Sequence, residues 1–395
     1  MSVVATLPSL PSGFVPAALA SAVRDETRVT TRAIDRVAYA SDASHFLLTP
    51  TGVVTAADAA EIAAILRGAS ASATPITFRS GGTSLSGQAS TGSILVDTRK
   101  YFRGIEVLDN GARVRVEPGA TVRQVNARLL RHGFRLGPDP ASEAACTIGG
   151  VVANNSSGMA CGTEENTYQT LESMVFVLPS GTIIDTAETN ADAHLKSAEP
   201  ELFEGLQRLR RRVISNAESV ELIKRQFAMK NTMGYGINSF VDYESPVDML
   251  MHLIIGSEGT LAFVASATYR TVPIKREITT TLAVFSTLDE ATQSLPALVG
   301  TGAATLELMD ATSIRVGQGF ADAPPEILGF APTNEAALLI EYHAGSIEEL
   351  AELQSLGTTT LGAHPLRAAA GFSTDAKERA PVSYTHLTLP TILRV

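Results

Sequence analysis

The sequence has no tryptophan and only two cysteines, Cys146 and Cys161, among 395 residues. Two cysteines cannot build the disulfide framework of a small secreted protein, and their spacing gives no CxxC motif for zinc or an iron–sulfur cluster. The seven histidines are scattered, without an HxH or HxxxH pair. We therefore predict no metal site within this sequence.

Long hydrophobic runs and an excess of positive charge are also missing. The longest apolar run, 249–255, is interrupted by His252 and is too short to span a bilayer. The first 20 residues lack the positive region of a signal peptide. Lys and Arg total 31 against 41 Asp and Glu, a net charge of -10, whereas nucleic-acid binding needs a basic surface. We expect no nucleic-acid partner, no transmembrane segment, and a cytoplasmic protein or one peripheral to the inner membrane.

The patterning predicts several helices and strands in the first 275 residues. Thr55 with Asp58 can cap a helix that Gly68 ends, and Thr121 can cap another. The run 109–111, Asp-Asn-Gly, between alternating strands indicates a hairpin. The charged segment 200–226 has helical spacing, and 250–272 suggests short apolar strands.

From residue 276 the pattern changes to strand, helix, strand, strand and helix. This order is that of a ferredoxin-like unit without its last strand. Thr287 with Glu290, and Ser346 with Glu349, have the spacing of helix caps. We therefore place a domain boundary near residue 275.

Segment 79–87, RSGGTSLSG, is the first with a chemical signature. Its paired glycines let backbone N–H groups face one concavity, and its hydroxyl side chains add donors. This composition predicts a pyrophosphate nest. It lacks both the Walker and the GxGxxG patterns, and an ordinary turn is the alternative.

Two further segments are poor in bulky side chains. Segment 137–158, GPDPASEAACTIGGVVANNSSG, has little that could fill a core, so we infer that a flat ligand occupies the space. Segment 255–263, IGSEGTLAF, follows a lysine-bearing run at 230–238, KNTMGYGIN. Alone, each could be a tight loop.

In this order and spacing, the three segments resemble the vanillyl-alcohol oxidase (PCMH-type) FAD-binding fold. Within it they are most similar to FAD-linked D-2-hydroxyacid dehydrogenases, such as glycolate oxidase FAD subunits and D-lactate or D-2-hydroxyglutarate dehydrogenases. The resemblance covers roughly residues 35–380 and implies an α+β fold, with two FAD-binding subdomains followed by an incomplete ferredoxin-like substrate cap. The expected divisions are a lead-in at 1–45, the FAD-binding domain at 46–275, the partial cap at 276–380 and a tail at 381–395.

The resemblance also implies cofactor-binding residues. FAD is expected to be noncovalent, because 79–88 contains no histidine and neither cysteine is placed to link it. The residues implied to border it are Arg79, Ser80, Gly81, Gly82, Thr83, Ser84, Pro138, Asp139, Ser142, Thr147, Gly149, Gly150, Asn155, Gly158, Glu258, Gly259 and Phe263.

The sequence departs from the family pattern at Val151, where asparagine is usual, and at Ser156 and Ser157, where alanine and glycine are usual. The family's catalytic histidines, basic substrate ligands and divalent metal ligands lie in the distal half of the cap, and an iron–sulfur domain follows in some members. The tail 381–395 resembles a translated sequencing adaptor, so we expect those parts to be missing; a short natural extension is the alternative. No catalytic residue is assigned, although His252 and His343 are candidates.

The activity implied is oxidation of a small D-2-hydroxy acid (2-hydroxyglutarate, lactate or glycolate class) to the 2-oxo acid by hydride transfer to flavin N5, with electrons passing to a downstream acceptor. The chain is expected to be an inactive fragment of such an enzyme. The alternative is a module that binds FAD or a nucleotide diphosphate without redox activity. A third hypothesis, an NADPH-dependent flavin reductase of cell-wall synthesis, fits segment 137–158 less well.

Overall fold

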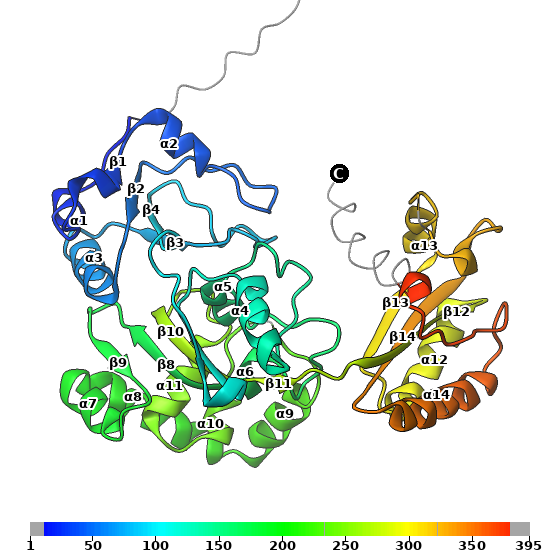
Figure 1. The fold of residues 1–395 in the computed structure, drawn as a ribbon. Helices are drawn as coiled ribbons and strands as arrows, with labels where there is room; N and C mark the ends of the chain where they lie inside the picture. The colour runs from blue at the N-terminus through cyan, green and yellow to red at the C-terminus, as the bar shows by residue number, and fades with distance from the viewer. Residues whose placement is uncertain (1–11, 233, 322, 380–395) are drawn as a thin grey trace, which may run out of the picture. The chain divides into compact units, whose positions relative to one another are not determined.

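The computed structural model describes residues 12–232, 234–321 and 323–379, and the predicted tail at 381–395 lies outside them. The chain divides into two compact units (Figure 1). The first comprises residues up to Gly158 together with 163–272, and the second comprises 159–162 and the residues from Pro273 onward. This division falls close to the boundary expected near residue 275.

A four-stranded sheet of order β1-β2-β4-β3 opens the first unit. Strands β2 and β3 run parallel to β4, and β1 is antiparallel to β2. Strand β1 and helix α1 come from the segment expected to be a lead-in, so that segment is part of this sheet and its core. The elements are α1 (Ala17–Ala20), η1 (Glu26–Arg28), β1 (Val29–Thr30), α2 (Ala33–Ala38), β2 (Gly52–Thr55), α3 (Ala59–Ala71), β3 (Ile76–Arg79) and β4 (Ile94–Asp97).

Helix α3 begins and ends differently from the sequence prediction. Asp58, not Thr55, is its N-cap and accepts from the Glu61 N–H. The helix continues through Gly68 to Ala71, where Gly68 packs its Cα side against the backbone of Ala18. Glycine is therefore needed at position 68 because α3 packs closely on the backbone of α1, and not because the helix ends there.

A five-stranded antiparallel sheet of order β5-β6-β10-β8-β9 forms the second part of the first unit. The predicted hairpin is confirmed between β5 and β6, where Asn110 and Gly111 have φ of 55° and 102°. The strands are β5 (Ile105–Leu108), β6 (Arg113–Val116), β8 (Leu171–Val177), β9 (Ile183–Asp185) and β10 (Phe263–Arg270); β7 (Phe134–Arg135) pairs separately with β11 (Val272–Pro273).

The helices of this part correct two sequence predictions. Segment 200–226 is helical but is divided where Asn216 caps a second helix. Segment 250–272 begins in a helix, not a strand, capped by Ser245 with Pro246 in its first turn. The helices are α4 (Val122–Leu129), η3 (Leu130–His132), α5 (Ile148–Ala153), α6 (Thr167–Thr170), α7 (Ala191–Ala198), α8 (Pro200–Ile214), α9 (Ala217–Phe227), α10 (Ser239–Asp242) and α11 (Pro246–Ile254), and η2 (Asp109–Gly111) closes the hairpin.

Two hydrophobic cores meet at the five-stranded sheet. The larger lies between this sheet and helices including α4, α5 and α11. The smaller lies between α3 and the first sheet, and it also contains Val177 of β8 and Phe263 of β10. The four-stranded and five-stranded parts of the first unit therefore pack against each other through shared apolar side chains. This packing holds the loops that connect the two sheets in place.

The second unit has the predicted strands and helices in order, with an unpredicted helix, α13, and a short 3-10 helix between its second and third strands. Its three-stranded antiparallel sheet has the order β12-β14-β13. Both predicted caps are confirmed: Thr287 and Glu290 form a reciprocal capping box, and Ser346 accepts from the Glu349 N–H. The elements are β12 (Glu277–Phe285), α12 (Leu288–Val299), β13 (Thr305–Met309), α13 (Ala311–Gly317), η4 (Pro325–Ile327), β14 (Ala336–Ala344) and α14 (Ile347–Gly362).

The place of the last ferredoxin-like strand is partly filled. Segment 366–373 runs antiparallel along β12, through bridges from Phe285 to Leu366 and from Thr280 to Ser373. The Ser373 N–H donates to the Thr280 carbonyl at 2.9 Å. The pairing is too irregular to form a continuous strand. It nevertheless covers the edge of β12 that does not pair with β14, where the sequence predicted no strand.

Candidate functional site

The predicted pyrophosphate loop packs directly against the second glycine-rich segment. The Gly81 N–H donates to Thr147 Oγ1 at 3.3 Å. A Cβ atom on Gly81 would lie 2.7 Å from the Ala145 carbonyl oxygen. Glycine is therefore required here because two backbones approach closely, and the approach joins segments 66 residues apart.

Arg79 ties this loop to the N-terminal part of the chain. Its guanidinium donates to the carbonyls of Tyr39 at 3.0 Å and Ser41 at 2.6 Å. The Gly82 carbonyl accepts from the Ala43 N–H at 2.9 Å, and Gly82 has φ of 65°. A Cβ on Gly82 would lie 2.8 Å from the guanidinium Nε, so Arg79 holds a positive charge against the loop while its donors bind protein carbonyls.

Some hydroxyl groups of the loop, predicted to be phosphate donors, already have protein partners. Ser84 Oγ donates to Gln88 Oε1 within the same loop, and Ser80 Oγ lies 3.5 Å from the Pro118 carbonyl. Thr83 and Ser84 are both half-buried. These side chains brace the loop in the structure, and their contact with a phosphate stays a prediction.

The two glycines of the GG pair face different surroundings. Gly149 packs on Pro118: its N–H donates to the Pro118 carbonyl at 3.0 Å, and a Cβ would lie 2.6 Å from Pro118 Cβ. Gly150 faces open space, where a Cβ would have only Thr147 Oγ1 at 4.0 Å. Gly150 is thus the member of the pair that leaves room for a ligand at the start of α5.

The third segment is hydrogen-bonded to the second. The Gly256 N–H donates to the Val152 carbonyl at 2.9 Å, and the Glu258 N–H donates to the Ala153 carbonyl at 2.8 Å. A Gly256 Cβ would lie 3.3 Å from Asn155 Cβ. Gly259, with φ of 76°, has nothing within 4 Å of its Cβ position, so it also borders open space.

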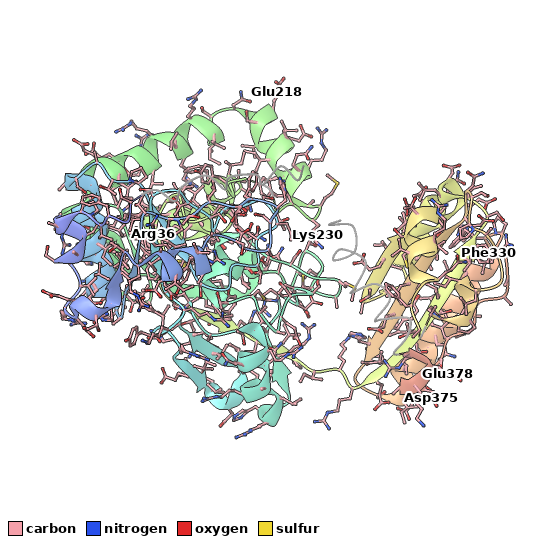
Figure 2. All side chains as sticks on the ribbon, turned by 90° about the horizontal axis from the view of Figure 1, so that it is seen from above. Arg36, Glu218, Lys230, Phe330, Asp375 and Glu378 are labelled. Atoms are coloured by element: carbon pink, nitrogen blue, oxygen red, sulfur yellow. The ribbon has the colours of Figure 1, made fainter. Side chains whose placement is uncertain are left out.

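The lysine-bearing run 230–238 lies at the same place. Lys230, labelled in Figure 2, donates from Nζ to the Gly158 carbonyl at 3.1 Å. Tyr235 and Thr260 share a hydrogen bond of 2.8 Å between their hydroxyls. A Cβ on Gly158 would lie 2.0 Å from the Asp139 carbonyl oxygen, so the Pro-Asp-Pro loop adjoins it. The first and third glycine-rich segments and the run at 230–238 therefore all contact the second segment, within the first unit.

Two predicted residues, Phe263 and Pro138, are buried, and a third, Ser142, is exposed. Phe263 is buried, with its ring 4.9 Å from Phe78 and 5.4 Å from Phe102 between centroids, so its side chain belongs to the smaller core. Pro138 is buried as well, whereas Ser142 is exposed in a turn. Any cofactor contact of Phe263 would have to use its backbone.

Several polar groups near the second and third segments have no partner among the described residues. Asn155 Oδ1 and Ser257 Oγ are buried without a hydrogen bond. Burial of the Glu258 side chain raises the pKa of its carboxyl. Because a buried polar atom without a partner is unfavourable, these groups fit a site that a polar ligand completes.

His252 is part of the core rather than a base. It is 2% exposed on α11, its ring stacks on Tyr243 at 3.9 Å, and its Nδ1 bonds the Asp248 carbonyl at 2.9 Å. Burial lowers its pKa to about 4. This histidine is therefore neutral at pH 7 and has no access to a substrate in this arrangement.

His343 belongs to a separate polar cluster in the second unit. Its Nε2 lies 2.6 Å from Glu341 Oε1, and Thr280 Oγ1 donates to the other Glu341 oxygen at 2.7 Å. Burial alone would raise the Glu341 pKa, but the hydrogen bonds from His343 and Thr280 lower it. The carboxylate orients the imidazole, an arrangement that also occurs in structural clusters.

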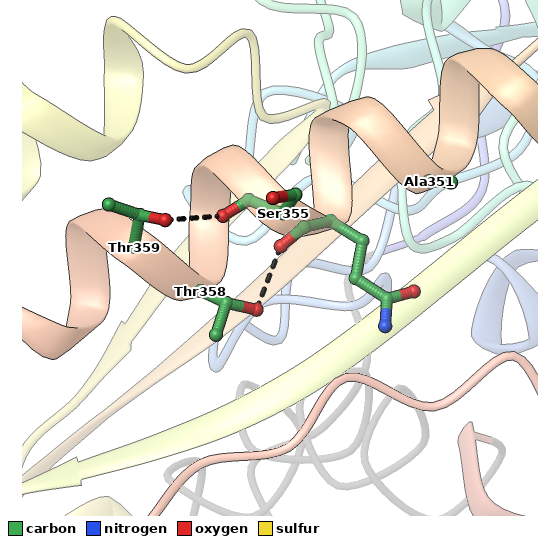
Figure 3. Close-up of a pocket in the computed structure, with 5 residues that line it drawn as sticks. Ala351, Ser355, Thr358 and Thr359 are labelled. Atoms are coloured by element: carbon green, nitrogen blue, oxygen red, sulfur yellow. Dashed lines mark hydrogen bonds between the residues drawn. The ribbon is translucent and has the colours of Figure 1, made fainter.

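A surface hollow of about 300 Å³ in the second unit is a poor candidate for a site (Figure 3). Its lining residues all come from α14. The threonine hydroxyls there donate to helix carbonyls, Thr358 to Gln354 at 2.8 Å and Thr359 to Ser355 at 2.9 Å. The described residues contain no cluster of three or more metal-ligating side chains, and no described helix is long and apolar enough to cross a membrane.

Sequence analysis missed Pro118 and Ser257. The Pro118 carbonyl accepts from Gly149 and lies next to Ser80, so it joins both glycine-rich segments. The Pro118-Gly119 dipeptide after β6 was a turn signal that could have identified it. Ser257 gave no signal of its own because a serine between Gly256 and Glu258 is ordinary in a turn.

Two family models match parts of this chain. Residues 50–187 match the family model of an FAD binding domain, and residues 274–386 match that of the C-terminal domain of FAD linked oxidases. Fold and family matches thus define a two-domain α+β protein, in which a PCMH-type FAD-binding domain is followed by an FAD-linked oxidase C-terminal domain.

Individual relatives are distant. D-2-hydroxyglutarate dehydrogenase of Pantoea ananatis is 29% identical over 70% of this chain and 28% of its own length. D-lactate dehydrogenase of Archaeoglobus fulgidus is 30% identical over 60% of this chain and 42% of its length. Glycolate oxidase subunit GlcD of Escherichia coli is 26% identical over 68% and 43%. The chain therefore matches less than half of the length of each of these relatives.

A solved structure of alkyldihydroxyacetonephosphate synthase shares the fold. It matches with a TM-score of 0.66 at 14% identity, over 98% of this chain and 67% of that one. At this identity the likeness shows the fold alone.

Proposed function

We propose that this chain binds FAD noncovalently in the first unit and belongs to an enzyme that oxidises a small D-2-hydroxy acid to the 2-oxo acid. The observation that carries the proposal is the direct contact of segments 79–87, 137–158 and 255–263. They are joined by the hydrogen bonds from Gly81 to Thr147 and from Glu258 to Ala153. Gly150 and Gly259 leave open space beside these contacts, and the buried Oδ1 of Asn155 has no hydrogen-bond partner among the described residues.

The residues present fit a dinucleotide whose pyrophosphate is held by backbone N–H donors beside the positive charge of Arg79. Backbone N–H groups of the 80–84 loop and Arg79 are suited to the pyrophosphate, because glycines let amides approach an anion closely. Segments 147–158 and 258–263 are suited to the ring and its polyol chain. Oxidation of a 2-hydroxy acid removes the hydroxyl proton and the α-hydrogen with its electron pair, and bound FAD supplies the acceptor for that pair.

We propose further that turnover by this chain alone is slow or absent. The reaction needs a base for the hydroxyl proton. His252 is buried and neutral, and His343 lies in the second unit with its Nε2 engaged by Glu341. As part of the same proposal, the substrate belongs to the 2-hydroxyglutarate, lactate or glycolate class. The electrons then pass from the flavin to a downstream acceptor.

The test is reconstitution with FAD, removal of free cofactor, and an anaerobic absorbance spectrum. Retention of FAD supports the proposed site, and bleaching by the D but not the L isomer of lactate or 2-hydroxyglutarate supports the reaction. Bound flavin that no hydroxy acid bleaches favours the alternative, a cofactor-binding module without redox activity of its own. A colourless protein after reconstitution would contradict the FAD proposal.

A further inference from the structure

Arg79 and Asp97 are register partners at the carboxyl ends of two parallel strands, β3 and β4. Register partners point to the same face of a sheet, where an arginine and a carboxylate normally form an ion pair. No ion pair joins either residue to any described residue. Asp97 is only 9% exposed and Arg79 is half-buried. Because buried charges are normally paired, the separation of these two requires an explanation.

Tyr39, which ends α2, bonds to both residues instead. Its hydroxyl donates to Asp97 Oδ2 at 2.6 Å, and its carbonyl accepts from Arg79 Nη1 at 3.0 Å. The guanidinium carbon also lies over the Tyr39 ring, 5.8 Å from the ring centroid. The positive group is therefore at the face of the ring and the negative group at its hydroxyl end, so Tyr39 keeps the two charges apart.

The other contacts of the two charged groups are with neutral backbone. Arg79 Nη2 donates to the Ser41 carbonyl at 2.6 Å, and the Arg99 N–H donates to Asp97 Oδ1 at 2.8 Å. Burial and the hydrogen bond to Asp97 raise the pKa of the Tyr39 hydroxyl, which therefore stays protonated and donates at neutral pH. Within the described part of the chain, the guanidinium thus has carbonyl dipoles against it but no carboxylate.

This uncompensated charge lies at the start of the predicted pyrophosphate loop. Arg79 directly precedes Ser80, and a Cβ on Gly82 would lie 2.8 Å from the guanidinium Nε. The segment that supplies Tyr39 also holds the loop, because the Ala43 N–H donates to the Gly82 carbonyl at 2.9 Å. Attraction between a guanidinium and a diphosphate is stronger in a partly desolvated site than in water. An ion pair with Asp97 would cancel much of that attraction.

We propose that Tyr39 is a positioning residue, which holds Asp97 away from Arg79 so that the arginine charge acts on the pyrophosphate of the cofactor. The inference rests on the proposed function. It adds Tyr39 and Asp97, which the family resemblance does not imply, and it gives Tyr39 a role that is exerted through Arg79. The segment expected to be a lead-in therefore serves the cofactor site.

The test measures FAD dissociation constants of the full chain at low and high salt by quenching of flavin fluorescence. Tyr39→Phe frees Asp97 to pair with Arg79 and is expected to weaken binding at low salt about tenfold, the scale of one charge-assisted hydrogen bond. FAD affinity should also depend less on salt than in the parent chain, because a neutralised arginine attracts the pyrophosphate less. Riboflavin, which has no phosphate, should bind both proteins equally.

A second substitution separates this role from folding. In the double variant Tyr39→Phe, Asp97→Asn, the amide has no charge with which to capture Arg79. The double variant is therefore expected to regain most of the FAD affinity and the salt dependence of the parent chain. A purely structural role of Tyr39 predicts the opposite, because the second substitution would add to the loss.

Tyr168→Phe is the matched control, since the Tyr168 hydroxyl donates to Asp242 Oδ2 at 2.9 Å in the same unit. It loses an equivalent bond, so it should lower the melting temperature of the apo protein and leave the salt dependence of FAD affinity unchanged. Parent-like affinity in Tyr39→Phe, equal losses for FAD and riboflavin, or a double variant weaker than Tyr39→Phe would overturn the inference while FAD binding stands. A parent chain that retains no FAD would instead contradict the proposed function.

Discussion

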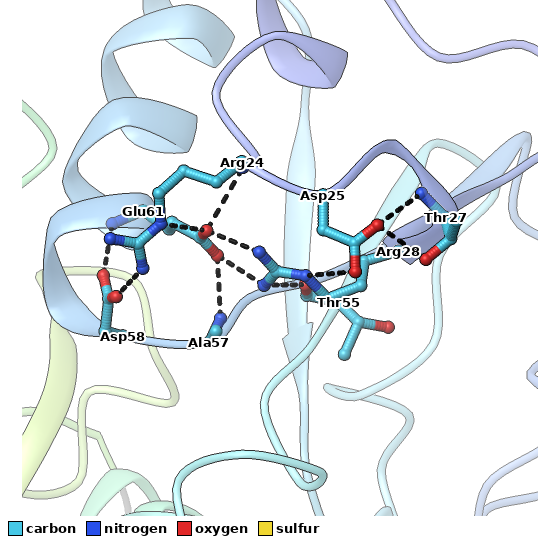
Figure 4. A network of polar contacts seen from close by, with 8 residues as sticks. All are labelled: Arg24, Asp25, Thr27, Arg28, Thr55, Ala57, Asp58 and Glu61. Atoms are coloured by element: carbon cyan, nitrogen blue, oxygen red, sulfur yellow. Dashed lines mark hydrogen bonds and ion pairs between the residues drawn. The ribbon is translucent and has the colours of Figure 1, made fainter.

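Arg28 and Glu61 form a two-point ion pair that joins the N-terminal segment to the start of α3 (Figure 4). Both guanidinium–carboxylate distances are 2.6 Å, and the side chains are only 9% and 3% exposed. Arg24 and the Ala57 N–H also donate to Glu61, at 3.0 and 2.9 Å. The pair therefore fixes β1 and its neighbours beside the sheet from which the 79–87 loop extends.

This ion pair predicts acid sensitivity of the first unit. Burial alone would raise the Glu61 pKa, but hydrogen bonds led by Arg28 lower it to about 2. Its stabilising contribution is complete above the pKa of an unfolded glutamate, about 4.5, and is lost as pH falls toward 2. We expect the free energy of unfolding of Glu61→Gln to be lower at pH 7 by about 3 kcal/mol, since a buried guanidinium loses its partner.

Denaturant titrations at pH 7 and pH 3 check this expectation. Glu61→Gln should lose less stability than the parent chain between the two values. Arg208→Ala breaks an exposed pair with Glu204 and is the control, expected to cost less than about 1 kcal/mol. Equal acid sensitivity of parent and Glu61→Gln would show that other carboxyls govern acid unfolding.

Gly357 of α14 gives a prediction for the second unit. A Cβ at this position would lie 2.6 Å from the Tyr342 hydroxyl, which is buried and bonded to Thr301 at 2.6 Å. Alanine gains up to about 1 kcal/mol in helix propensity, but overpacking a buried contact costs about 1–3 kcal/mol. We expect Gly357→Ala to lower the thermal midpoint of the unit.

Gly362 in the last turn of the same helix is the matched control. Nothing lies within 4 Å of its Cβ position, so Gly362→Ala should be neutral or slightly stabilising. Calorimetry of both variants separates packing from propensity. If both raised the midpoint, the close contact between Gly357 and Tyr342 would have no energetic weight.

Short-range signals account for what could be predicted from the sequence. The caps at Thr287 and Ser346 and the Asn110-Gly111 hairpin depend on neighbouring residues, and all are confirmed. The three glycine-rich segments could be singled out because their small side chains cannot fill a core. The contacts of the second segment with the first and the third are observed, while contacts with a cofactor stay predictions.

Tertiary packing explains what the sequence did not reveal. Every residue of helix α11 except the half-buried Asp248 is buried, so its apolar residues show no helical period. Helix α5 contains Gly149 and Gly150, which conceal a helix in a segment with loop composition. The Pro118 contacts and the pairing of 366–373 with β12 join residues distant in sequence, which composition cannot specify.

His252 should produce a second pH effect, in a higher range than Glu61. Its pKa falls from about 6.5 in an unfolded chain to about 4 in the folded protein, because of burial. Between these values the unfolded chain binds a proton that the folded chain refuses, so stability decreases as pH falls through this window. A shift of this size corresponds to about 3 kcal/mol at pH 4.

His252→Asn can keep a donor near the Asp248 carbonyl while removing the titration. We expect it to be less stable at pH 7, because the ring contacts with Tyr168 and Tyr243 are lost, but to lose less stability between pH 7 and pH 4.5. FAD retention at pH 7 should be unchanged. A variant of normal stability that binds FAD but is no longer bleached by a hydroxy acid would instead indicate a catalytic histidine.

Gly150 and Gly205 provide the sharpest test of where the cofactor lies. Both are helix glycines in the first unit whose Cβ positions are almost free, with only Thr147 Oγ1 at 4.0 Å from Gly150 and an Arg208 nitrogen at 3.7 Å from Gly205. Alanine at either position should leave the fold intact or stabilise it by about 0.5–1 kcal/mol. The free protein therefore gives no reason for glycine at position 150.

A flat ligand against α5 does give such a reason. Gly150→Ala places a methyl group in the space beside Thr147 and should weaken FAD binding about tenfold or more, the cost of a steric overlap in a packed contact. Gly205→Ala on α8 should bind FAD as the parent chain does. Flavin fluorescence and thermal melts of the two apo variants measure both quantities. Because the apo stabilities are expected to match, a loss of affinity confined to Gly150→Ala can arise only from the ligand, and equal affinities would place the cofactor away from the start of α5.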